Sequence, residues 1–357
     1  MPASATTDLF DTVPPEERTA LRRTARPESP TPMLATLTER YFSDPGWIFE
    51  RKLDGVRCLA FRDGTRAGLL SRSGQKLGDT YPEITDALAR QDCDDFVVDG
   101  EMVAFDGSRT SFARLQQRSG IHDRRRALAR ARQVAVTYYV FDLLYLAGHD
   151  VTGLPLRTRK ALLRRALDFS GPLRFTPHRN TVGEEYLSQA CERGWEGVIA
   201  KRADSRYEHR RSTKWLKFKC SRRQELVIGG YTDPEGSRTG FGALLVGHYE
   251  GRRLVYAGKV GTGYNRTTLA DLRARMDDLA QDDCPFAQTP RARGTHWTRP
   301  ELVAEIAFTE WTDDGKLRHP RFIALRGDKP AKAVVRERPG DRARENRTEP
   351  DGTRENR

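Results

Sequence analysis

The segment Glu50-Arg51-Lys52-Leu53-Asp54-Gly55-Val56-Arg57 constrains this chain more than any other part of its sequence. Lys52 lies two residues before an Asp-Gly pair, which favours a turn, and Arg57 follows two residues after that pair. We expect the turn to make Lys52 and Arg57 face one pocket. Taken alone, the pattern is more often a β-hairpin turn with solvated charges, because short motifs recur by chance.

Lys52 is suited to covalent nucleotidyl transfer. A primary amine can attack the α-phosphorus of a nucleotide and retain the nucleoside monophosphate as a phosphoramidate. The reference pKa of a lysine side chain is about 10.4, so a site that uses the amine must desolvate it or surround it with cations. The segments downstream decide between this chemistry and a plain turn.

Five further segments follow in one order, and each supplies a residue type that binding a nucleoside triphosphate requires. Arg72 offers a guanidinium to a phosphate or ribose, and Phe141 offers an aromatic ring that can stack on a base. The five segments are Ser71-Arg72-Ser73-Gly74, Phe96-Val97-Val98-Asp99-Gly100-Glu101, Tyr138-Tyr139-Val140-Phe141-Asp142-Leu143-Leu144, Glu196-Gly197-Val198-Ile199-Ala200-Lys201 and Trp215-Leu216-Lys217-Phe218-Lys219.

Carboxylates and lysines in these segments predict a site for phosphates and a hard metal ion. Glu101 ends one apolar strand and Glu196 precedes another. Mg²⁺ is usually held by one or two carboxylates together with substrate phosphates. Lys217 and Lys219 alternate with apolar residues, so both ammonium groups are expected on one face of a strand.

With these motifs the chain resembles an ATP-dependent DNA ligase of the covalent nucleotidyltransferase superfamily. It is most similar to the small bacterial two-domain ligases related to the ligase module of end-joining enzymes. The six segments match motif I, the arginine motif and motifs III, IIIa, IV and V, and residues 317–329 match motif VI. Residues 236–242 and 258–263 also resemble that bacterial subgroup. Seven motifs in order, across about residues 31–335, are far more specific than any one of them.

The resemblance implies an α+β fold with two domains. Residues 31–221 are expected to form the adenylation domain, a nucleotidyltransferase (ATP-grasp-like) domain of antiparallel sheets with flanking helices. Residues 222–335 are expected to form a C-terminal OB-fold β-barrel, which their short strands and Gly-rich turns also favour. Polar, Pro-rich and charged composition predicts a disordered leader at residues 1–30 and a disordered charged tail at residues 336–357.

The resemblance also implies a role for each site residue. Lys52 is the expected catalytic nucleophile, and Glu101 and Glu196 are expected to hold Mg²⁺, with Mn²⁺ as an alternative. Lys217, Lys219 and the metal ion are expected to lower the pKa of Lys52 by raising the local positive potential. The residues expected on the cofactor ATP are Glu50 at the adenine N6 amino group, Leu53, Arg57, Arg72, Glu101, Phe141 stacked on adenine, Arg211, Lys217, Lys219, Arg326, Asp328 and Lys329.

The implied reaction seals a nick between a 5′-phosphate and a 3′-hydroxyl. AMP passes from ATP to Lys52, then to the 5′-phosphate, and the 3′-hydroxyl finally displaces it. Arg326, Asp328 and Lys329 are expected to close over the pyrophosphate from the second domain and then to swing away, exposing a DNA-binding face.

Charge and cysteine content agree with this interpretation. The chain has 62 Lys+Arg against 50 Asp+Glu, a net charge of +12, which favours a polyanionic partner; nicked double-stranded DNA is the partner that the resemblance implies. There is no apolar run of about 18 residues and no signal-like N-terminus, so we expect no membrane contact and a cytoplasmic, nucleoid-associated protein. Without a C-x-x-C pair, we expect reduced thiols at the five cysteines, which are Cys58, Cys93, Cys191, Cys220 and Cys284.

Three other functions stay open at the level of sequence. An RNA ligase or an mRNA-capping guanylyltransferase shares the lysine chemistry, although Glu50 suits adenine better than the guanine carbonyl. A non-enzymatic DNA-binding protein on a ligase scaffold is the third, and the intact motif set argues against it. The resemblance favours DNA repair or end joining, with a DNA-end-binding protein or a repair polymerase as expected partners. We expect a monomer.

Hydrophobic periodicity predicts the elements that surround the motifs. Asp63-Gly64 is expected to join strands at residues 56–61 and 67–71 into a hairpin. The arginines at residues 124–126 are expected on a solvated helix face. Helices are expected at residues 157–167, 183–193 and 268–279, and later strands at residues 225–231, 243–249, 254–259 and 301–311.

Overall fold

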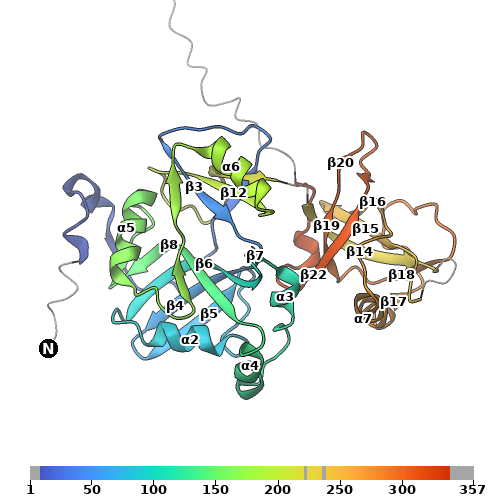
Figure 1. Cartoon of the computed structure of the whole chain (residues 1–357), viewed down its shortest axis with the longest axis horizontal. Coiled ribbons are helices and arrows are strands. Elements are labelled where there is room, and N and C mark those ends of the chain that lie inside the picture. Colours follow the sequence, from blue (N-terminus) through green and yellow to red (C-terminus); the bar gives the residue numbers. More distant parts are fainter. Residues whose placement is uncertain (1–8, 221–222, 235–238, 338–357) are drawn as a thin grey trace, which may run out of the picture.

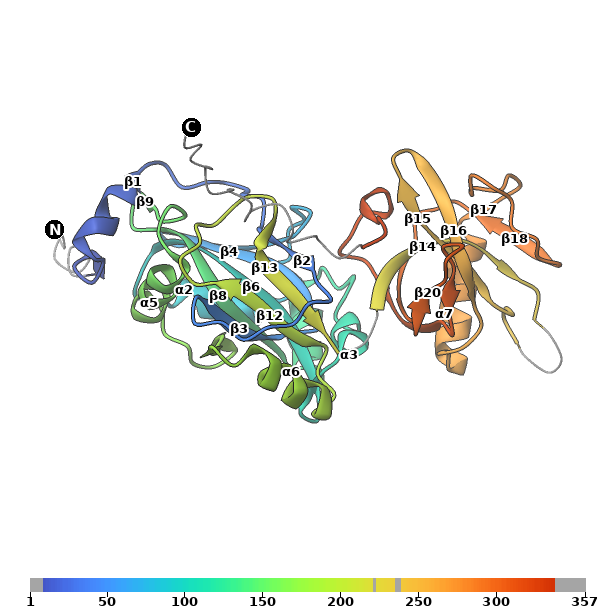
Figure 2. The same ribbon diagram turned by 90° about the horizontal axis from the view of Figure 1, so that it is seen from above.

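Long strands with alternating side chains build two facing sheets in the first part of the chain. The computed structural model describes residues 9–220, 223–234 and 239–337. We call residues 9–220 the two-sheet module and the described residues from 223 to 337 the C-terminal module; the two lie side by side (Figure 2). The α+β class predicted from the sequence is confirmed.

The larger sheet has the strand order β1-β9-β8-β6-β4-β5, with β10 beside β8 and β7 beside β6. Its pairs are antiparallel except for β10 with β8. The predicted hairpin at Asp63-Gly64 is confirmed, because Asp63 pairs with Arg66 across the turn. The strands are β1 (Arg22–Arg23), β4 (Val56–Asp63), β5 (Arg66–Ser71), β6 (Asp95–Asp106), β7 (Arg109–Thr110), β8 (Val136–Leu146), β9 (His149–Asp150) and β10 (Leu173–Phe175).

The second sheet has the order β11-β3-β12-β13-β2. Its register aligns Lys52 of β3 and Lys219 of β13 with Gly197 of β12, so both lysines lie at the same end of the sheet. Glu196 precedes Gly197 and therefore reaches that end as well. The strands are β2 (Leu34–Leu37), β3 (Trp47–Lys52), β11 (His178–Asn180), β12 (Gly197–Arg202) and β13 (Arg211–Lys219).

Strand alternation divides the core into layers. On β4, Cys58 and Ala60 face α2 (Pro82–Ala89) and α5 (Leu156–Ala166), whereas Leu59 faces the second sheet and packs near Trp215. The outer face of the second sheet is covered by α6 (Gly183–Glu192), above β3 and β12 in Figure 1. The inner faces of the two sheets therefore enclose a space that helices do not fill. Short helices α3 (Phe112–Gln116) and α4 (Arg124–Ala131) follow β7.

The Asp54-Gly55 link between β3 and β4 requires glycine. A Cβ atom on Gly55 would lie 2.1 Å from the backbone oxygen of Met102 on β6. Real side chains do not tolerate that distance, so only glycine lets β4 pair closely with β6 here. This approach brings Lys52 near Glu101, which is paired in register with Arg57.

The C-terminal module, as far as it is described, has an antiparallel sheet, the separate pair β20-β21, one α-helix and a 3₁₀-helix, η2 (Ala331–Ala333). The strand order of the sheet is β16-β15-β14-β18-β17, and β19 pairs with both β14 and β22. Among the described residues no pairing closes this sheet into a barrel. The predicted strand at residues 301–311 is two strands. The elements are β14 (Arg223–Thr232), β15 (Leu244–Glu250), β16 (Arg253–Val260), α7 (Arg266–Asp277), β17 (Ala280–Gln281), β18 (Thr295–Thr298), β19 (Val303–Ala307), β20 (Glu310–Trp311), β21 (Leu317–Arg318) and β22 (Arg321–Arg326).

Two predictions of disorder are wrong for the residues that the structure describes. Residues 9–30 pack on the two-sheet module, because Val13 is 1% exposed and β1 pairs with β9. A 3₁₀-helix, η1 (Pro15–Ala20), lies between them. At the other end, Arg336 and Glu337 contact both modules. The remaining leader and tail, residues 1–8 and 338–357, lie outside the described residues, as do 221–222 at the predicted hinge and 236–238.

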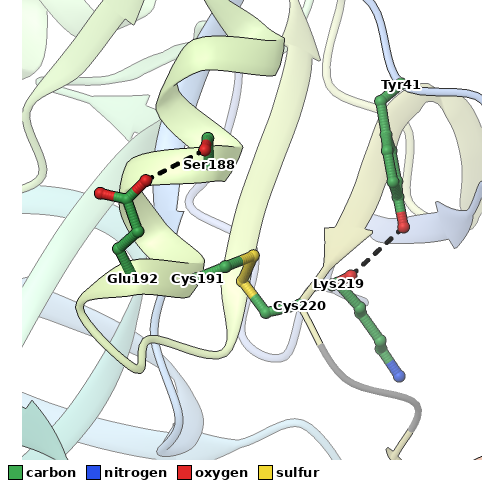
Figure 3. Close-up of a disulfide and its surroundings, with 6 residues drawn as sticks. All are labelled: Tyr41, Ser188, Cys191, Glu192, Lys219 and Cys220. Atoms are coloured by element: carbon green, nitrogen blue, oxygen red, sulfur yellow. Dashed lines mark hydrogen bonds between the residues drawn. A yellow bond between two sulfur atoms is a disulfide. The ribbon is translucent and has the colours of Figure 1, made fainter.

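A disulfide between Cys191 and Cys220 corrects the expectation of reduced thiols (Figure 3). The two cysteines are 29 residues apart in sequence, but their Cα atoms are 5.2 Å apart. They meet because β12, which follows α6, pairs with β13, and the Cys220 N–H donates to the Glu196 carbonyl. Sequence spacing did not reveal this pairing. The three other cysteines are free thiols. Across the described residues, none of the helices has the length and apolar character needed to cross a bilayer.

A buried ion pair ties α5 to the larger sheet and offers a test of the fold. Arg159 and Asp142 are both 0% exposed, and Nε and Nη2 of Arg159 donate to the two carboxylate oxygens at 2.7 and 2.8 Å. Arg159→Met leaves a buried carboxylate without its partner, which costs about 3–5 kcal/mol of unfolding free energy. Chemical denaturation would measure the loss, with exposed Arg165→Met on the same helix as control. Equal stability of both variants would contradict this packing.

Candidate active site

Two adjoining cavities lie where the inner faces of the sheets meet the C-terminal module. Their volumes are about 170 and 100 Å³. Every site residue predicted from the sequence lines at least one of them. The first is lined by Glu50, Lys52, Leu53, Arg57, Arg72, Glu101, Phe141, Arg211, Lys217, Arg326 and Asp328, and the second also by Glu196, Lys219 and Lys329.

Lys52 is held by Glu196 at the floor of these cavities. Its Nζ lies 2.6 Å from Oε1 of Glu196, and the side chains are 18% and 8% exposed. Burial acts to lower the pKa of Lys52, but Glu196, with Glu101 and Asp54, outweighs it and raises that pKa above its ordinary value. Lys217 and Lys219 alone therefore do not lower the pKa of Lys52, and the expected contribution of the metal ion stays a prediction.

Two other carboxyl groups at the site, those of Glu101 and Asp54, have raised pKa values because nearby cations do not offset their burial. Burial raises the pKa of Glu101 to about 7 despite Arg57 and Lys52. Burial and the nearby Glu196 and Glu305 carboxylates raise the pKa of Asp54 to about 7. A carboxyl with such a pKa is stabilised as the charged form by an added cation. Glu196, Glu101 and Asp54 are therefore the acidic groups that act on Lys52.

Lys217 and Lys219 share the inner face of β13, as their alternation predicts. Both ammonium groups bind one carboxylate from the C-terminal end of the described chain: Nζ of Lys217 lies 2.5 Å from Oε1 of Glu337, and Nζ of Lys219 lies 3.0 Å from Oε2. Burial and the Lys219 and Lys52 ammonium groups, partly offset by Glu337, lower the pKa of Lys217 to about 8. The pair forms a ready site for an anion.

Glu50 lies between two lysines that the site prediction did not include. Its carboxylate is 2.5 Å from Nζ of Lys160 on α5 and 2.6 Å from Nζ of Lys201 on β12, and all three side chains are at most 3% exposed. The Lys201 ammonium also lies 4.1 Å from the ring centroids of Phe141 and Trp215. Burial, with Lys160 adding to it and Glu50 opposing it, lowers the pKa of Lys201 to about 8.

Arg57 is fixed rather than free at the inner wall. Its Nε and Nη2 donate to the Asp99 carboxylate at 2.6 Å each, and its guanidinium carbon lies 4.5 Å from the ring centroid of Phe141. The hydroxyl of Tyr207 donates to the same carboxylate. Arg211 is also anchored, since its Nη1 donates to the Ala35 carbonyl at 2.7 Å. Hydrogen bonds therefore hold both arginine side chains in fixed positions in the cavity wall.

Three motif VI residues of the C-terminal module, Arg326, Asp328 and Lys329, also line these cavities. Nη2 of Arg326 donates to the Gly55 carbonyl at 3.3 Å, and its guanidinium carbon lies 3.9 Å from the ring centroid of Phe112. Asp328 pairs with Arg326 at 2.9 Å. Nζ of Lys329 lies 2.7 Å from the Glu225 carboxylate. The structure is thus a closed arrangement, and the pyrophosphate role of these residues stays a prediction.

The acidic groups fit a divalent cation that also takes ligands from a substrate. Glu101 and Glu196 line the same cavity, and the raised pKa of Glu101 indicates a carboxylate that a cation would stabilise. Among the described residues no three acidic, histidine or cysteine side chains gather closely enough to hold a metal by themselves. Mg²⁺ commonly keeps waters and phosphate oxygens in place of a complete protein cage.

Several functional side chains escaped sequence reasoning. Lys201 had a usable signal, because alternation along β12 places it on the inner face with Ile199. Lys160 had no such signal in the sequence. Helix α5 carries several basic residues, and nothing in the sequence marks the one that pairs with Glu50. Glu305 and Glu337 come from the C-terminal module, so only its docking brings them to the cavity.

The site combines a buried lysine among carboxylates with an anion-binding lysine pair on β13 of the same sheet, an arrangement suited to nucleotidyl transfer. Comparison with protein families is more specific. Residues 32–219 match the model described as ATP dependent DNA ligase domain, and residues 237–329 match ATP dependent DNA ligase C terminal region. The chain therefore belongs to the ATP-dependent DNA ligase family, as its motifs predict, and ATP-dependent DNA joining is the function of that family.

Individual relatives agree. The chain is 39% identical over 326 residues to the multifunctional non-homologous end joining protein LigD of Pseudomonas aeruginosa, covering 89% of this chain and 38% of that protein. It is also 39% identical to LigD of Mycobacterium tuberculosis, covering 86% and 40%. The chain thus spans about two fifths of these relatives. A solved structure of mycobacterial DNA ligase D complexed with ATP and MES has a TM-score of 0.61 and 36% identity, over 86% of this chain and 98% of that one.

The buried Lys160–Glu50–Lys201 triad predicts unequal costs for two substitutions. Glu50→Gln leaves two buried ammonium groups without a carboxylate, whereas Lys201→Met leaves one intact ion pair. We expect Glu50→Gln to lose about 3–5 kcal/mol of unfolding free energy and Lys201→Met to lose less. Chemical denaturation at neutral pH measures both. A larger loss for Lys201→Met would contradict this charge balance.

Proposed function

We propose that this chain seals nicks in double-stranded DNA, and that Lys52 is the residue that becomes adenylylated. The observation that carries the proposal is the placement of Lys52 beside Glu196 and Glu101, in the same cavity as the Lys217 and Lys219 ammonium groups. The deprotonated Lys52 amine attacks the α-phosphorus of ATP, the N–P bond forms, and the P–O bond to pyrophosphate breaks. Lys217 and Lys219 stabilise the negative charge on the phosphate.

The inner cavity is where we propose that adenosine binds. Phe141 lines it and its ring stacks on adenine, and Glu50 accepts from the N6 amino group. Lys160 and Lys201 keep Glu50 charged, because burial raises its pKa but the two ammonium groups lower it further. Arg57, Arg72, Arg211 and Leu53 complete the contacts with ribose and phosphates.

We propose that Glu101 and Glu196 hold the metal ion. When bound, Mg²⁺, or Mn²⁺ in its place, offsets negative charge on the phosphates. The protein's own residues do the rest: they orient the nucleotide, keep bulk water from Lys52 and neutralise the α-phosphate.

DNA binding and pathway are proposed from charge and relatives. The net charge of +12 favours a polyanion, and the small sheet of the C-terminal module supports an OB-type nucleic-acid surface. The LigD relatives are named for non-homologous end joining, so we propose repair or end joining as the pathway, with an end-binding protein or a polymerase as partner. We propose a monomer whose domain boundary lies near residue 221.

We further propose that the C-terminal module alternates between two positions. Arg326, Asp328 and Lys329 orient the pyrophosphate in the closed position, and the module then moves away so that DNA can reach the lysyl-AMP. The contacts of Arg326 with Gly55 and Phe112 support the closed position.

Removing the Lys52 amine tests the central assignment. We expect Lys52→Ala to lose covalent labelling by α-labelled ATP entirely and to fail on a nick with an ordinary 5′-phosphate. The same variant should still seal a nick that is already adenylylated, at a reduced rate, because loading is then bypassed. GTP serves as the control nucleotide. Labelling of the variant that survives denaturation would refute the assignment.

A second prediction separates the loading step from the sealing step. Alanine at Asp328 and Lys329 should slow self-adenylylation by about 10²-fold or more, the loss seen when a charge-stabilising contact is removed. Sealing of a pre-adenylylated nick should change little. Single-turnover rates of both steps measure this. Normal loading with failed sealing would assign these residues to the DNA steps.

A further inference from the structure

The last described residues form a strap that is anchored on the C-terminal module. We call Val334–Glu337 the C-terminal strap. Val334 is 0% exposed in a cluster with Val227 and Leu245, and its carbonyl accepts from the Tyr249 N–H at 2.7 Å. The strap is therefore packed into the module before it reaches the active site.

Gln224 at the start of β14 sets the direction of the strap. Its Nε2 donates to the Val335 carbonyl at 3.1 Å, and its Oε1 accepts from the Glu337 N–H at 3.2 Å. The Arg336 guanidinium carbon lies 4.3 Å from the ring centroid of Trp311. With the preceding backbone held in this way, the Glu337 side chain reaches β13 of the other module.

The Glu337 carboxylate occupies the anion site of β13. One oxygen binds Lys217 at 2.5 Å and the other binds Lys219 at 3.0 Å, and the side chain is 17% exposed. Burial raises the pKa of Glu337, but the two lysines outweigh it and hold it well below the usual range. Two oxygens on two ammonium groups reproduce the contacts that a phosphate would make.

We infer that Glu337 is an internal substitute for a nucleotide phosphate, which ATP must displace from Lys217 and Lys219 before Lys52 can be loaded. The inference rests on the proposed function, which assigns these lysines to the phosphates. Cavity size supports it: the inner cavity holds about 170 Å³, below the roughly 300–1,000 Å³ of typical ligand pockets. The inner cavity is therefore expected to widen when ATP binds.

Displacement would have two consequences. The strap links the modules, so its release removes one contact between them, while the Arg326 contacts with Gly55 and Phe112 still hold the closed arrangement. The bound strap also weakens the apparent affinity for ATP, because only protein molecules in which Lys217 and Lys219 are free of Glu337 can bind the nucleotide. If about a tenth of the molecules have the pair free, the apparent dissociation constant rises about ten-fold.

Glu337→Gln in the full-length chain tests the inference, since it removes the charge and keeps the size. Lysyl-AMP formation is measured in single turnover over a range of ATP concentrations. We expect the half-saturating ATP concentration to fall about ten-fold, with little change in the maximal rate. Glu310→Gln is the matched control, because Glu310 pairs with Arg318 on the exposed β20–β21 pair, outside both cavities.

A binding measurement separates this inference from the proposed function. Calorimetric titration of ATP and of inorganic pyrophosphate, with and without Glu337→Gln in the Lys52→Ala background, reports affinity without chemistry. Tighter binding by the Glu337→Gln protein supports displacement even if lysyl-AMP were never found. Unchanged binding, or weaker binding because Glu337 positions the lysines, overturns it.

Discussion

The ion pair between Lys52 and Glu196 is the interaction on which the rest of the site depends. It is 2.6 Å long and largely buried, and it favours the protonated form of Lys52, the proposed nucleophile. Glu101 and Asp54 add to the negative charge around it, with pKa values near 7. Under the proposed function, a cation at these carboxylates would weaken their hold on the Lys52 proton, so nucleotide binding and activation of Lys52 would be coupled.

Sheet register makes this arrangement possible. Lys52, Gly197 and Lys219 are aligned across three strands, and the tight Gly55 link brings the opposite sheet, with Glu101, to the same end. The C-terminal module then closes the open side with groups of both signs. The active site is therefore shared between modules, and any motion of the second module changes the charge around Lys52.

Sequence reasoning predicted what short-range patterns encode. Alternation placed Lys217 and Lys219 on one face, and Asp63-Gly64 predicted its hairpin. Sequence reasoning did not predict contacts between segments that are far apart in the chain. Nothing local marks Lys160 as the inward-facing residue of a basic helix, pairs Cys191 with Cys220, or brings Glu337 to β13. Nor did the sequence show that Glu196, Glu101 and Asp54 raise the pKa of Lys52.

Mapping the adenylylated residue tests the account most directly, because the site offers several lysines. Burial lowers the pKa of Lys201 and of Lys217 to about 8, so protonation alone would favour them over Lys52. The account holds that position among the carboxylates and phosphates selects the nucleophile. Peptide mass spectrometry after incubation with ATP should find AMP on Lys52 only. An adduct on Lys201 or Lys217 would contradict it.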